Sequence, residues 1–204
     1  RDTGRGLFLC DGEFRLEDEC LGRIEELALP GDFQRVNALV ALGLARRLGV
    51  EASELCRALP RIRGLAHRLQ DLGWFRGRRV IDNAVSTTPD STISALQALP
   101  PGTVLVLGGM AKRLPLETLA RVAGERVSLA ISFGQAGPLF AAALRGAGVA
   151  VETVETVEQA VGLALERAKP GEHVLFSPAG SSFDAFANFE ERAMAFRSTL
   201  EELR

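Results

Sequence analysis

Lysine is rare in this sequence, and one lysine stands where it could bind an anion. Of the 24 basic residues only Lys112 and Lys169 are lysines, and Lys112 comes shortly after the glycine pair Gly108-Gly109. Glycines allow a backbone to approach a ligand closely, and a lysine ammonium attracts a carboxylate or a phosphate as a point charge. Because lysines are also common on solvated surfaces, a binding role and a surface role both stay open for Lys112.

A second candidate site follows the apolar run His173–Phe176. The segment 177–186 is rich in small and hydroxyl-bearing residues, and it leads into a helix predicted from Asp184 to Leu203. Free N–H groups at a helix start, with hydroxyls beside them, form a site for a phosphate or a carboxylate. Ser181 and Asp184 could instead form a capping box, which many helices carry without any ligand.

Two further stretches carry polar or charged side chains. The segment 82–91 is dense in Asp, Asn, Ser and Thr, and its composition alone favours a helix cap before Pro89 over a ligand site. The arginines between residues 57 and 79 are better explained as solvated charge than as an RNA surface, because few aromatic residues lie among them. Within that run His67 and Arg68 are candidates for contact with a nucleotide.

Several common motifs are absent from the sequence. A P-loop needs Gly-x-x-x-x-Gly-Lys-Ser/Thr, but the residues after the two lysines are Arg113 and Pro170. No Gly-x-Gly-x-x-Gly leads from a strand into a helix, and the two histidines, His67 and His173, are isolated from each other. The sequence therefore predicts neither a metal site nor P-loop binding of ATP phosphates on this chain.

The candidate side chains need a fold that gathers them. From about Leu72 onward, short apolar runs alternate with amphipathic helical stretches, which is typical of a parallel sheet covered on both faces. We predict an α/β fold with a doubly wound, Rossmann-like, mostly parallel sheet, whose ligands bind outside the carboxyl ends of the strands. The predicted strands are Arg79–Ile81, Val104–Leu107, Val127–Ile131, Val149–Val151 and His173–Phe176. The predicted helices are Ser91–Leu99, Pro115–Val122, Pro138–Gly146, Val157–Ala168 and Asp184–Leu203.

The residues before this alternating region carry fewer elements. The pattern predicts a hairpin over residues 7–16 with its turn at Asp11-Gly12. It then predicts a helix with apolar residues at Val36, Leu39, Val40, Leu44 and Leu48, and a short helix over Ala52–Leu59. These elements do not supply enough strand for a domain of their own.

Composition narrows the class of protein. A net charge of −2 argues against bulk attraction to nucleic acid or to an anionic membrane, and 47% hydrophobic residues argue against disorder. The three cysteines form no Cys-x-x-Cys pair, so we expect a reducing, cytoplasmic setting. No apolar stretch is long enough to predict a membrane span. Because the chain opens without a methionine, we expect it to be part of a longer polypeptide.

Motifs spread over nearly the whole chain resemble those of one known family. The sequence is similar to the Mur ligases of peptidoglycan synthesis, and most similar to the branch that adds D-glutamate. The motif with the greatest length and specificity is Ser-Pro-Ala-x-x-Ser-x-Asp-x-Phe-x-x-Phe-Glu-x-Arg. The matching stretches are Leu29-Pro30-Gly31 with Asn37-Ala38-Leu39, Gly64–Arg68, Asp82–Pro89, Leu107–Lys112 and Ser177–Arg192.

The resemblance implies a domain organisation and a reaction. Residues 1–64 would be the end of a central ATPase domain, and residues 65–204 would be the C-terminal ligase domain. The reaction would be ATP-dependent amide formation through an acyl phosphate, joining D-glutamate to UDP-N-acetylmuramoyl-L-alanine. The cofactors would be ATP and Mg²⁺, with the Mg²⁺ ligands and the P-loop on a preceding part of the polypeptide. The resemblance also implies a cytoplasmic monomer that binds small molecules and no nucleic acid.

Site residues follow from the resemblance position by position, and none of them is a catalytic residue. The D-glutamate carboxylates would be bound at Lys112, Thr87, Ser182 and Phe183, and Phe189 would lie beside them. The base and ribose of ATP would be contacted at Asn37, Arg68 and Asn83. The first group agrees with the anion site expected from the lone lysine and the predicted helix start.

The sequence departs from the family's pattern mainly near the expected nucleotide. The family's His-Asn pair is replaced by Phe33-Gln34, and its Asp-Ser-Lys run by Asn83-Ala84-Val85. Gln70 replaces a common glutamate, and Ala193 replaces a glycine. The alternative to an active ligase is therefore a catalytically silent binding or regulatory module with a weakened ATP site. The long C-terminal motif favours the active ligase.

Overall fold

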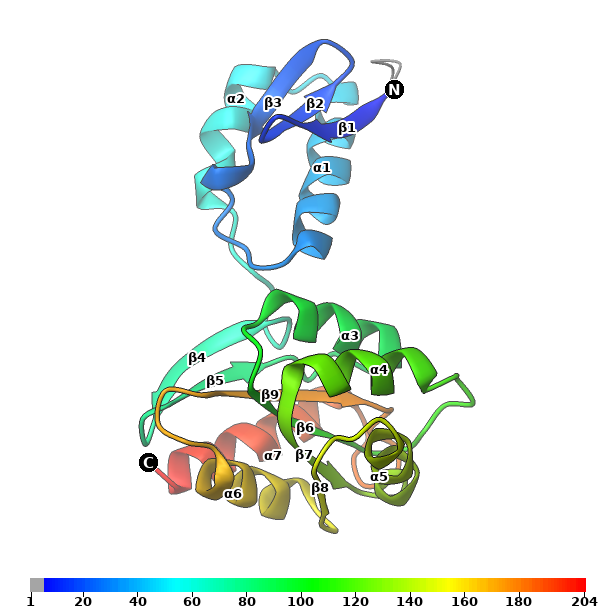
Figure 1. The fold of residues 1–204 in the computed structure, drawn as a ribbon. Coiled ribbons are helices and arrows are strands. Elements are labelled where there is room, and N and C mark those ends of the chain that lie inside the picture. Colours follow the sequence, from blue (N-terminus) through cyan, green and yellow to red (C-terminus); the bar gives the residue numbers. More distant parts are fainter. Residues whose placement is uncertain (1–5) are drawn as a thin grey trace. The chain divides into compact units, whose positions relative to one another are not determined.

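The computed structural model describes residues 6–204, and its contacts divide the chain into two compact units (Figure 1). The boundary between the units lies between Gly64 and Leu65. The expected hairpin and helices lie in the first unit, and the alternating strands and helices lie in the second. Residues 1–5 of the expected first domain lie outside the described residues.

The first unit is a small antiparallel sheet with two helices. Its elements are β1 (Leu7–Cys10), β2 (Glu13–Leu16), β3 (Glu19–Arg23), η1 (Ile24–Glu26), α1 (Asp32–Arg47), α2 (Ala52–Ala58) and η2 (Leu59–Arg61). The predicted hairpin is present, with Asp11 and Gly12 both at positive φ (50° and 79°). β3 was not predicted, because its sequence Glu-Cys-Leu-Gly-Arg lacks an alternating apolar pattern.

The buried face of α1 differs from the predicted one. Leu39 is buried as expected, but Val36, Val40 and Leu44 are 52%, 47% and 60% exposed. The helix instead buries Ala38, Leu39 and Leu42 against Phe14, Leu21 and Leu59. The buried face also contains Gln34 and Gly43, so the spacing of the apolar residues alone did not identify the side of the helix that faces the core.

The second unit contains a six-stranded sheet in the order β4-β5-β9-β6-β7-β8. Its strands are β4 (Gln70–Phe75), β5 (Arg78–Asp82), β6 (Thr103–Gly108), β7 (Val127–Phe133), β8 (Val151–Thr153) and β9 (His173–Ala179). All pairings are parallel except that of β4 with β5, so the predicted mostly parallel sheet is confirmed. β8 begins at Val151, two residues later than the predicted strand, and β4 was not predicted at all.

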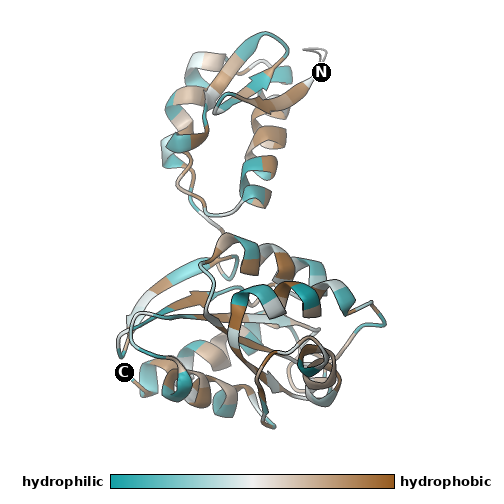
Figure 2. Cartoon of the chain, in the orientation of Figure 1, coloured by the Kyte–Doolittle hydropathy of each residue, from teal (hydrophilic) through white to brown (hydrophobic). Residues whose placement is uncertain are grey.

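Helices cover both faces of this sheet (Figure 1). The helices are α3 (Pro89–Ala98), α4 (Glu117–Arg126), α5 (Gly137–Gly146), α6 (Val157–Arg167) and α7 (Phe189–Glu202). α3 packs on α4 and α4 on α5, whereas α6 packs on α7 on the opposite face. β6 is buried along its whole length, as a central strand between two helical layers must be. Figure 2 shows that the central strands are mostly hydrophobic, whereas β4 at the edge and the helices also carry hydrophilic residues.

α7 begins at Phe189 and not at the predicted Asp184. Its N-cap is Asn188, whose side-chain oxygen accepts a hydrogen bond from the Glu191 N–H at 2.7 Å. Residues 182–186 form a single turn, in which the Ser182 carbonyl accepts hydrogen bonds from the N–H groups of Ala185 and Phe186. The predicted helix start at Asp184 is therefore wrong, because a separate turn at residues 182–186 comes before α7.

Candidate functional site

The loops that follow β5, β9 and β6 come together at the carboxyl edge of the sheet. β9 lies between β5 and β6, so these three strands end side by side. The loops after β9 and β6 are joined by a pair of backbone hydrogen bonds between Ser181 and Met110, at 2.8 and 2.9 Å. The predicted gathering of candidate residues at this edge therefore has a direct structural basis.

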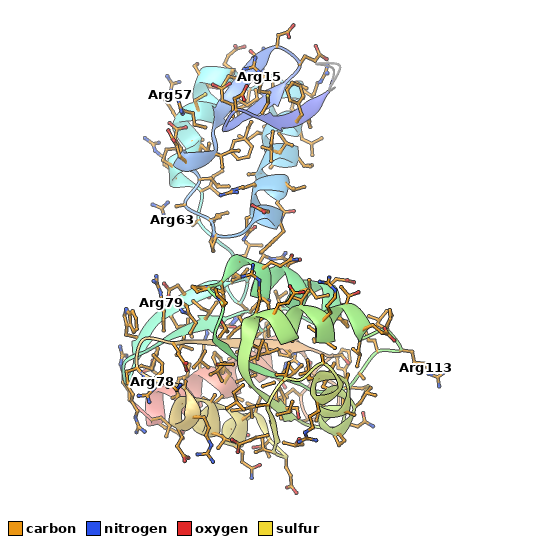
Figure 3. All side chains as sticks on the ribbon, in the orientation of Figure 1. Arg15, Arg57, Arg63, Arg78, Arg79 and Arg113 are labelled. Carbon is orange, nitrogen blue, oxygen red and sulfur yellow. The ribbon has the colours of Figure 1, made fainter. Side chains whose placement is uncertain are left out.

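Lys112 reaches back across this edge to the loop after β5. Its Nζ donates a hydrogen bond to Thr87 Oγ1 at 3.3 Å, although the two residues are 25 positions apart. Lys112 is exposed and Thr87 is half-buried, so the ammonium keeps donors for a further partner. The adjacent Arg113 points away from the sheet into solvent (Figure 3). The structure thus brings together two of the residues predicted to bind the acidic amino acid.

The two serines of the β9 loop are held in the protein rather than displayed. Ser182 is 2% exposed and Ser181 is 8% exposed, and the Ser181 hydroxyl donates to the Met110 carbonyl at 3.4 Å. Phe183 next to them is 68% exposed. A ligand at this loop would meet the turn formed by residues 182–186 and the Phe183 ring.

A buried arginine on α7 also holds the loop that follows β9. Arg192 is 0% exposed, and its guanidinium donates to the carbonyl oxygens of Gly180 at 2.9 Å and Ala84 at 3.3 Å. Burial lowers the pKa of Arg192 to about 10, and the charge of Asp184 partly counters that effect. Within the described residues its Nε lies buried without a hydrogen-bond partner. One side chain therefore ties the loops after β5 and β9 to α7.

The role of Arg192 was missed from the sequence, although a signal was present. On α7 the buried residues are Arg192, Ala193, Phe196, Thr199 and Leu200, which recur at helical spacing on one face. An arginine on the apolar face of a helix is rarely buried without hydrogen-bond partners. The place of Arg192 on that face could therefore have been used to predict that its guanidinium donates to other groups of the protein.

Gly109 serves packing within the protein rather than approach to a ligand. It has a φ of 99°, and a Cβ atom there would collide with the Ser181 carbonyl oxygen and lie 2.8 Å from a terminal guanidinium nitrogen of Arg192. The glycine pair was expected to let the backbone approach a ligand. Here Gly109 allows the β6 loop to approach the β9 loop and Arg192 instead.

Asn83, a predicted nucleotide contact, belongs to a buried polar network. Its side chain is 3% exposed, accepts a hydrogen bond from the Leu69 N–H at 3.1 Å and donates to Ser177 Oγ at 3.0 Å. Ser177 Oγ in turn lies 2.8 Å from Thr92 Oγ1, which lies 2.8 Å from Ser86 Oγ. This chain joins β5, β9 and α3 through side chains, and every member has a partner.

The other two predicted nucleotide residues lie in different units. Arg68 is half-buried in the second unit, directly after His67, and its N–H donates to the Leu65 carbonyl. Asn37 is exposed on α1 of the first unit, where its side chain donates to Gln34 Oε1 at 3.4 Å. Phe189, predicted to lie beside the amino acid, stacks edge-on against the His67 ring with 6.3 Å between ring centres.

A hollow of about 500 Å³ lies beside the β9 loop, at the carboxyl ends of β7 and β8. Its lining includes Gln135, Glu155 and Asp184. Asp184 Oδ2 accepts a hydrogen bond from the Gln135 N–H at 3.1 Å, which ties the start of α5 to the turn 182–186. Two acidic side chains at this hollow oppose the binding of an anion there, whereas the ammonium of Lys112 would attract one.

Within residues 6–204, no three His, Cys, Asp or Glu side chains come together in a way that could hold a metal ion. No helix in the same range is long and apolar enough to cross a membrane.

Residues 67–180 match the family described as "Mur ligase, glutamate ligase domain". Three relatives are each named UDP-N-acetylmuramoylalanine--D-glutamate ligase. The protein from Zymomonas mobilis is 38% identical over 86% of this chain and 39% of its own length. The proteins from Pelotomaculum thermopropionicum and Lacticaseibacillus paracasei are 36% and 33% identical, over 91% and 96% of this chain and 41% and 43% of their own lengths. The chain thus spans less than half the length of these relatives.

Solved structures show the same fold at low sequence identity. MurF from Acinetobacter baumannii has a TM-score of 0.68 at 19% identity, covering 96% of this chain and 44% of the other. MurF from Thermotoga maritima, solved in complex with ADP, has a TM-score of 0.60 at 17% identity, covering 98% of this chain and 45% of the other.

Proposed function

The chain belongs to the Mur ligase family, and from this premise we propose that it is the amino-acid-binding part of an ATP-dependent ligase that adds D-glutamate to UDP-N-acetylmuramoyl-L-alanine. The relatives that carry that name support the choice of substrates. Since this chain spans less than half of them, the complete activity would need a preceding part of the polypeptide.

One observation carries the proposal: Lys112 Nζ and Thr87 Oγ1 lie 3.3 Å apart at the carboxyl edge of the sheet. A dicarboxylate needs a fixed cation and hydroxyl or N–H donors close to it. Lys112 supplies the cation and Thr87 a hydroxyl, and the turn that follows β9 lies next to them through the Met110 and Ser181 pairing. We propose that Ser182, Phe183 and Phe189 complete this binding site.

The proposed reaction has two steps. The alanyl carboxylate attacks the terminal phosphorus of ATP, which forms an acyl phosphate and releases ADP. The D-glutamate amine then attacks the acyl carbon, so that the amide bond forms, phosphate leaves and the amine loses a proton. In both steps the part of this chain would be to hold reactants in place, because binding in a fixed geometry removes much of the entropic barrier.

For the nucleotide we propose a contact from Arg68, whereas Asn37, which lies in the other unit, stays a prediction from the resemblance alone. Both ends of the Asn83 amide are engaged inside the protein, so we propose that Asn83 acts on the nucleotide through Leu69, whose N–H it holds. We propose that Mg²⁺ is bound by a preceding part of the polypeptide, as the family resemblance implies. The proposed setting is the cytoplasm, and the proposed ligase is a monomer.

The test is a ligase assay on the polypeptide in which this chain follows its preceding part. ADP release should require UDP-N-acetylmuramoyl-L-alanine and D-glutamate together, and L-glutamate should not replace D-glutamate. The 204-residue chain alone should not hydrolyse ATP, since it has no P-loop. Binding of both substrates without ADP release would instead support the silent binding module.

A further inference from the structure

Two residues of the segment that carries Arg68 adopt an unusual backbone conformation. His67 and Leu69, on either side of Arg68, have φ angles of 60° and 46°. These are left-handed conformations that cost a side-chain-bearing residue about 1 kcal/mol or more. Such conformations persist only where surrounding groups hold them, so the contacts of this segment decide where Arg68 lies.

Four hydrogen bonds hold the backbone of the segment, one of which runs from the Arg68 N–H to the Leu65 carbonyl at 3.3 Å. The His67 N–H donates to Gln70 Oε1 at 3.0 Å, and the His67 carbonyl accepts from the Val85 N–H at 3.2 Å. The Leu69 N–H donates to Asn83 Oδ1 at 3.1 Å. The side chain of Leu69 is 4% exposed, so burial also holds this residue.

The His67 ring is held as firmly as its backbone. His67 Nδ1 lies 2.8 Å from Asp82 Oδ2, and the Asp82 carboxylate is fully buried at the end of β5. The other oxygen of Asp82 accepts a hydrogen bond from the Ala84 N–H at 3.0 Å. Asp82 and Gln70 are therefore two side chains that hydrogen-bond His67, one at its ring and the other at its N–H.

A single guanidinium on α7 binds both of these side chains. Arg197 Nε donates to Asp82 Oδ2 at 2.8 Å, and Arg197 Nη2 donates to Gln70 Oε1 at 2.6 Å. The planar fork of arginine can serve two separate acceptors at once, which a lysine ammonium cannot reproduce in the same geometry. Arg197 thus links α7 to both anchors of His67.

We propose that Arg197 is a positioning residue for nucleotide binding, which holds the Arg68 segment in place through Asp82, Gln70 and His67. This inference rests on the proposed function, since it takes Arg68 as the nucleotide contact. Arg197 itself acts on the protein and not on the ligand. Its loss should therefore weaken ATP binding while leaving the Lys112 side of the site unchanged.

The kinetic test compares Arg197→Lys with Arg121→Lys in the ligase. Arg121 is the matched control, because its pairing with Glu125 on α4 is exposed and far from this cluster in the fold. We expect Arg197→Lys to raise KM for ATP about tenfold, with KM for D-glutamate and kcat within about twofold of the parent. An unchanged KM for ATP, or an equal rise in both KM values, would overturn the inference.

A second measurement uses the 204-residue chain and needs no activity. In amide hydrogen exchange, Arg197→Lys and Gln70→Ala should speed exchange at the His67 and Leu69 amides. The N–H groups of Met110 and Ser181, each of which donates to the carbonyl of the other residue, should keep their protection. Unchanged protection at His67 and Leu69 would overturn the inference. If the parent ligase is inactive but the exchange rates change as expected, the proposed function is contradicted and the positioning role of Arg197 is not.

Discussion

Arg192 Nη1 lies 2.9 Å from the Gly180 carbonyl oxygen, so the first turn of α7 holds the loop that follows β9. The same guanidinium reaches the Ala84 carbonyl in the loop after β5. A buried cation therefore holds the loops of the candidate binding site without itself contacting a ligand. Replacing Arg192 should consequently lower the stability of the fold as well as change the shape of the site.

Replacing Arg192 should be costly. Arg192→Ala leaves two carbonyls without their donor and opens a cavity, and we expect a loss of roughly 3 kcal/mol in the free energy of unfolding. Denaturant titration, monitored by circular dichroism, measures this change in the free energy of unfolding. Arg121→Ala, at an exposed pair, should change stability by less than about 0.5 kcal/mol. A loss no larger than that of the control would contradict the role given to Arg192.

Replacing Gly109 and Gly162 by alanine should change the stability of the chain in opposite directions. Gly109→Ala adds a methyl group against the Ser181 carbonyl at a positive φ, and we expect it to destabilise the chain by roughly 2 kcal/mol or more. Gly162 lies inside α6 with no atom near the position of a Cβ, so Gly162→Ala should stabilise by about 0.5–1 kcal/mol. Thermal unfolding of both variants tests the pair, and a tolerated Gly109→Ala would refute the packing described for the two loops.

Removing the ammonium of Lys112 from the proposed amino-acid site should weaken the binding of D-glutamate but not that of ATP. Lys112→Ala in the ligase should raise KM for D-glutamate about tenfold or more and leave KM for ATP nearly unchanged, because the lost charge faces the amino acid. The neighbouring Arg113→Ala is the matched control, since that side chain points into solvent (Figure 3). A larger effect of Lys112→Ala on ATP than on D-glutamate would contradict the proposed site.

Stability should depend on pH through His173. Burial, and then the nearby charge of Arg79, lower the pKa of His173 below its ordinary 6.5, while Asp71 opposes this shift. As pH falls below about 6.5, the unfolded chain takes up the proton more readily than the folded protein, so the folded protein loses stability. His173→Gln should remove this loss.

The measurement compares the unfolding free energies of the parent and of His173→Gln between pH 5 and 8. The parent should lose stability relative to the variant as pH falls through the lower half of that range, and a constant difference would show that His173 does not titrate differently on folding. Comparing the two proteins cancels the titrating groups that do not interact with His173.

Much of the second unit could be predicted from sequence because its signal is local. Val104–Leu107 is continuously apolar, which only a strand buried on both faces requires, and it is the centre of β6. The resemblance placed Lys112 and Thr87 in one site, but the contact between them depends on a strand order that the sequence did not predict. β4 escaped prediction because an edge strand with Asp71 and Gly73 needs no apolar pattern.

The sequence by itself determined the parallel sheet, the family and the edge at which the candidate residues gather, since these depend on residue types and on their order. Only the tertiary structure decided that α7 begins at Phe189, that Asn83 is engaged inside the protein, and that Arg192 and Arg197 hold loops distant in sequence. The physical reason is that a hydrogen bond depends on which donor and acceptor the packed chain brings within about 3 Å of each other, and local sequence does not specify that distance.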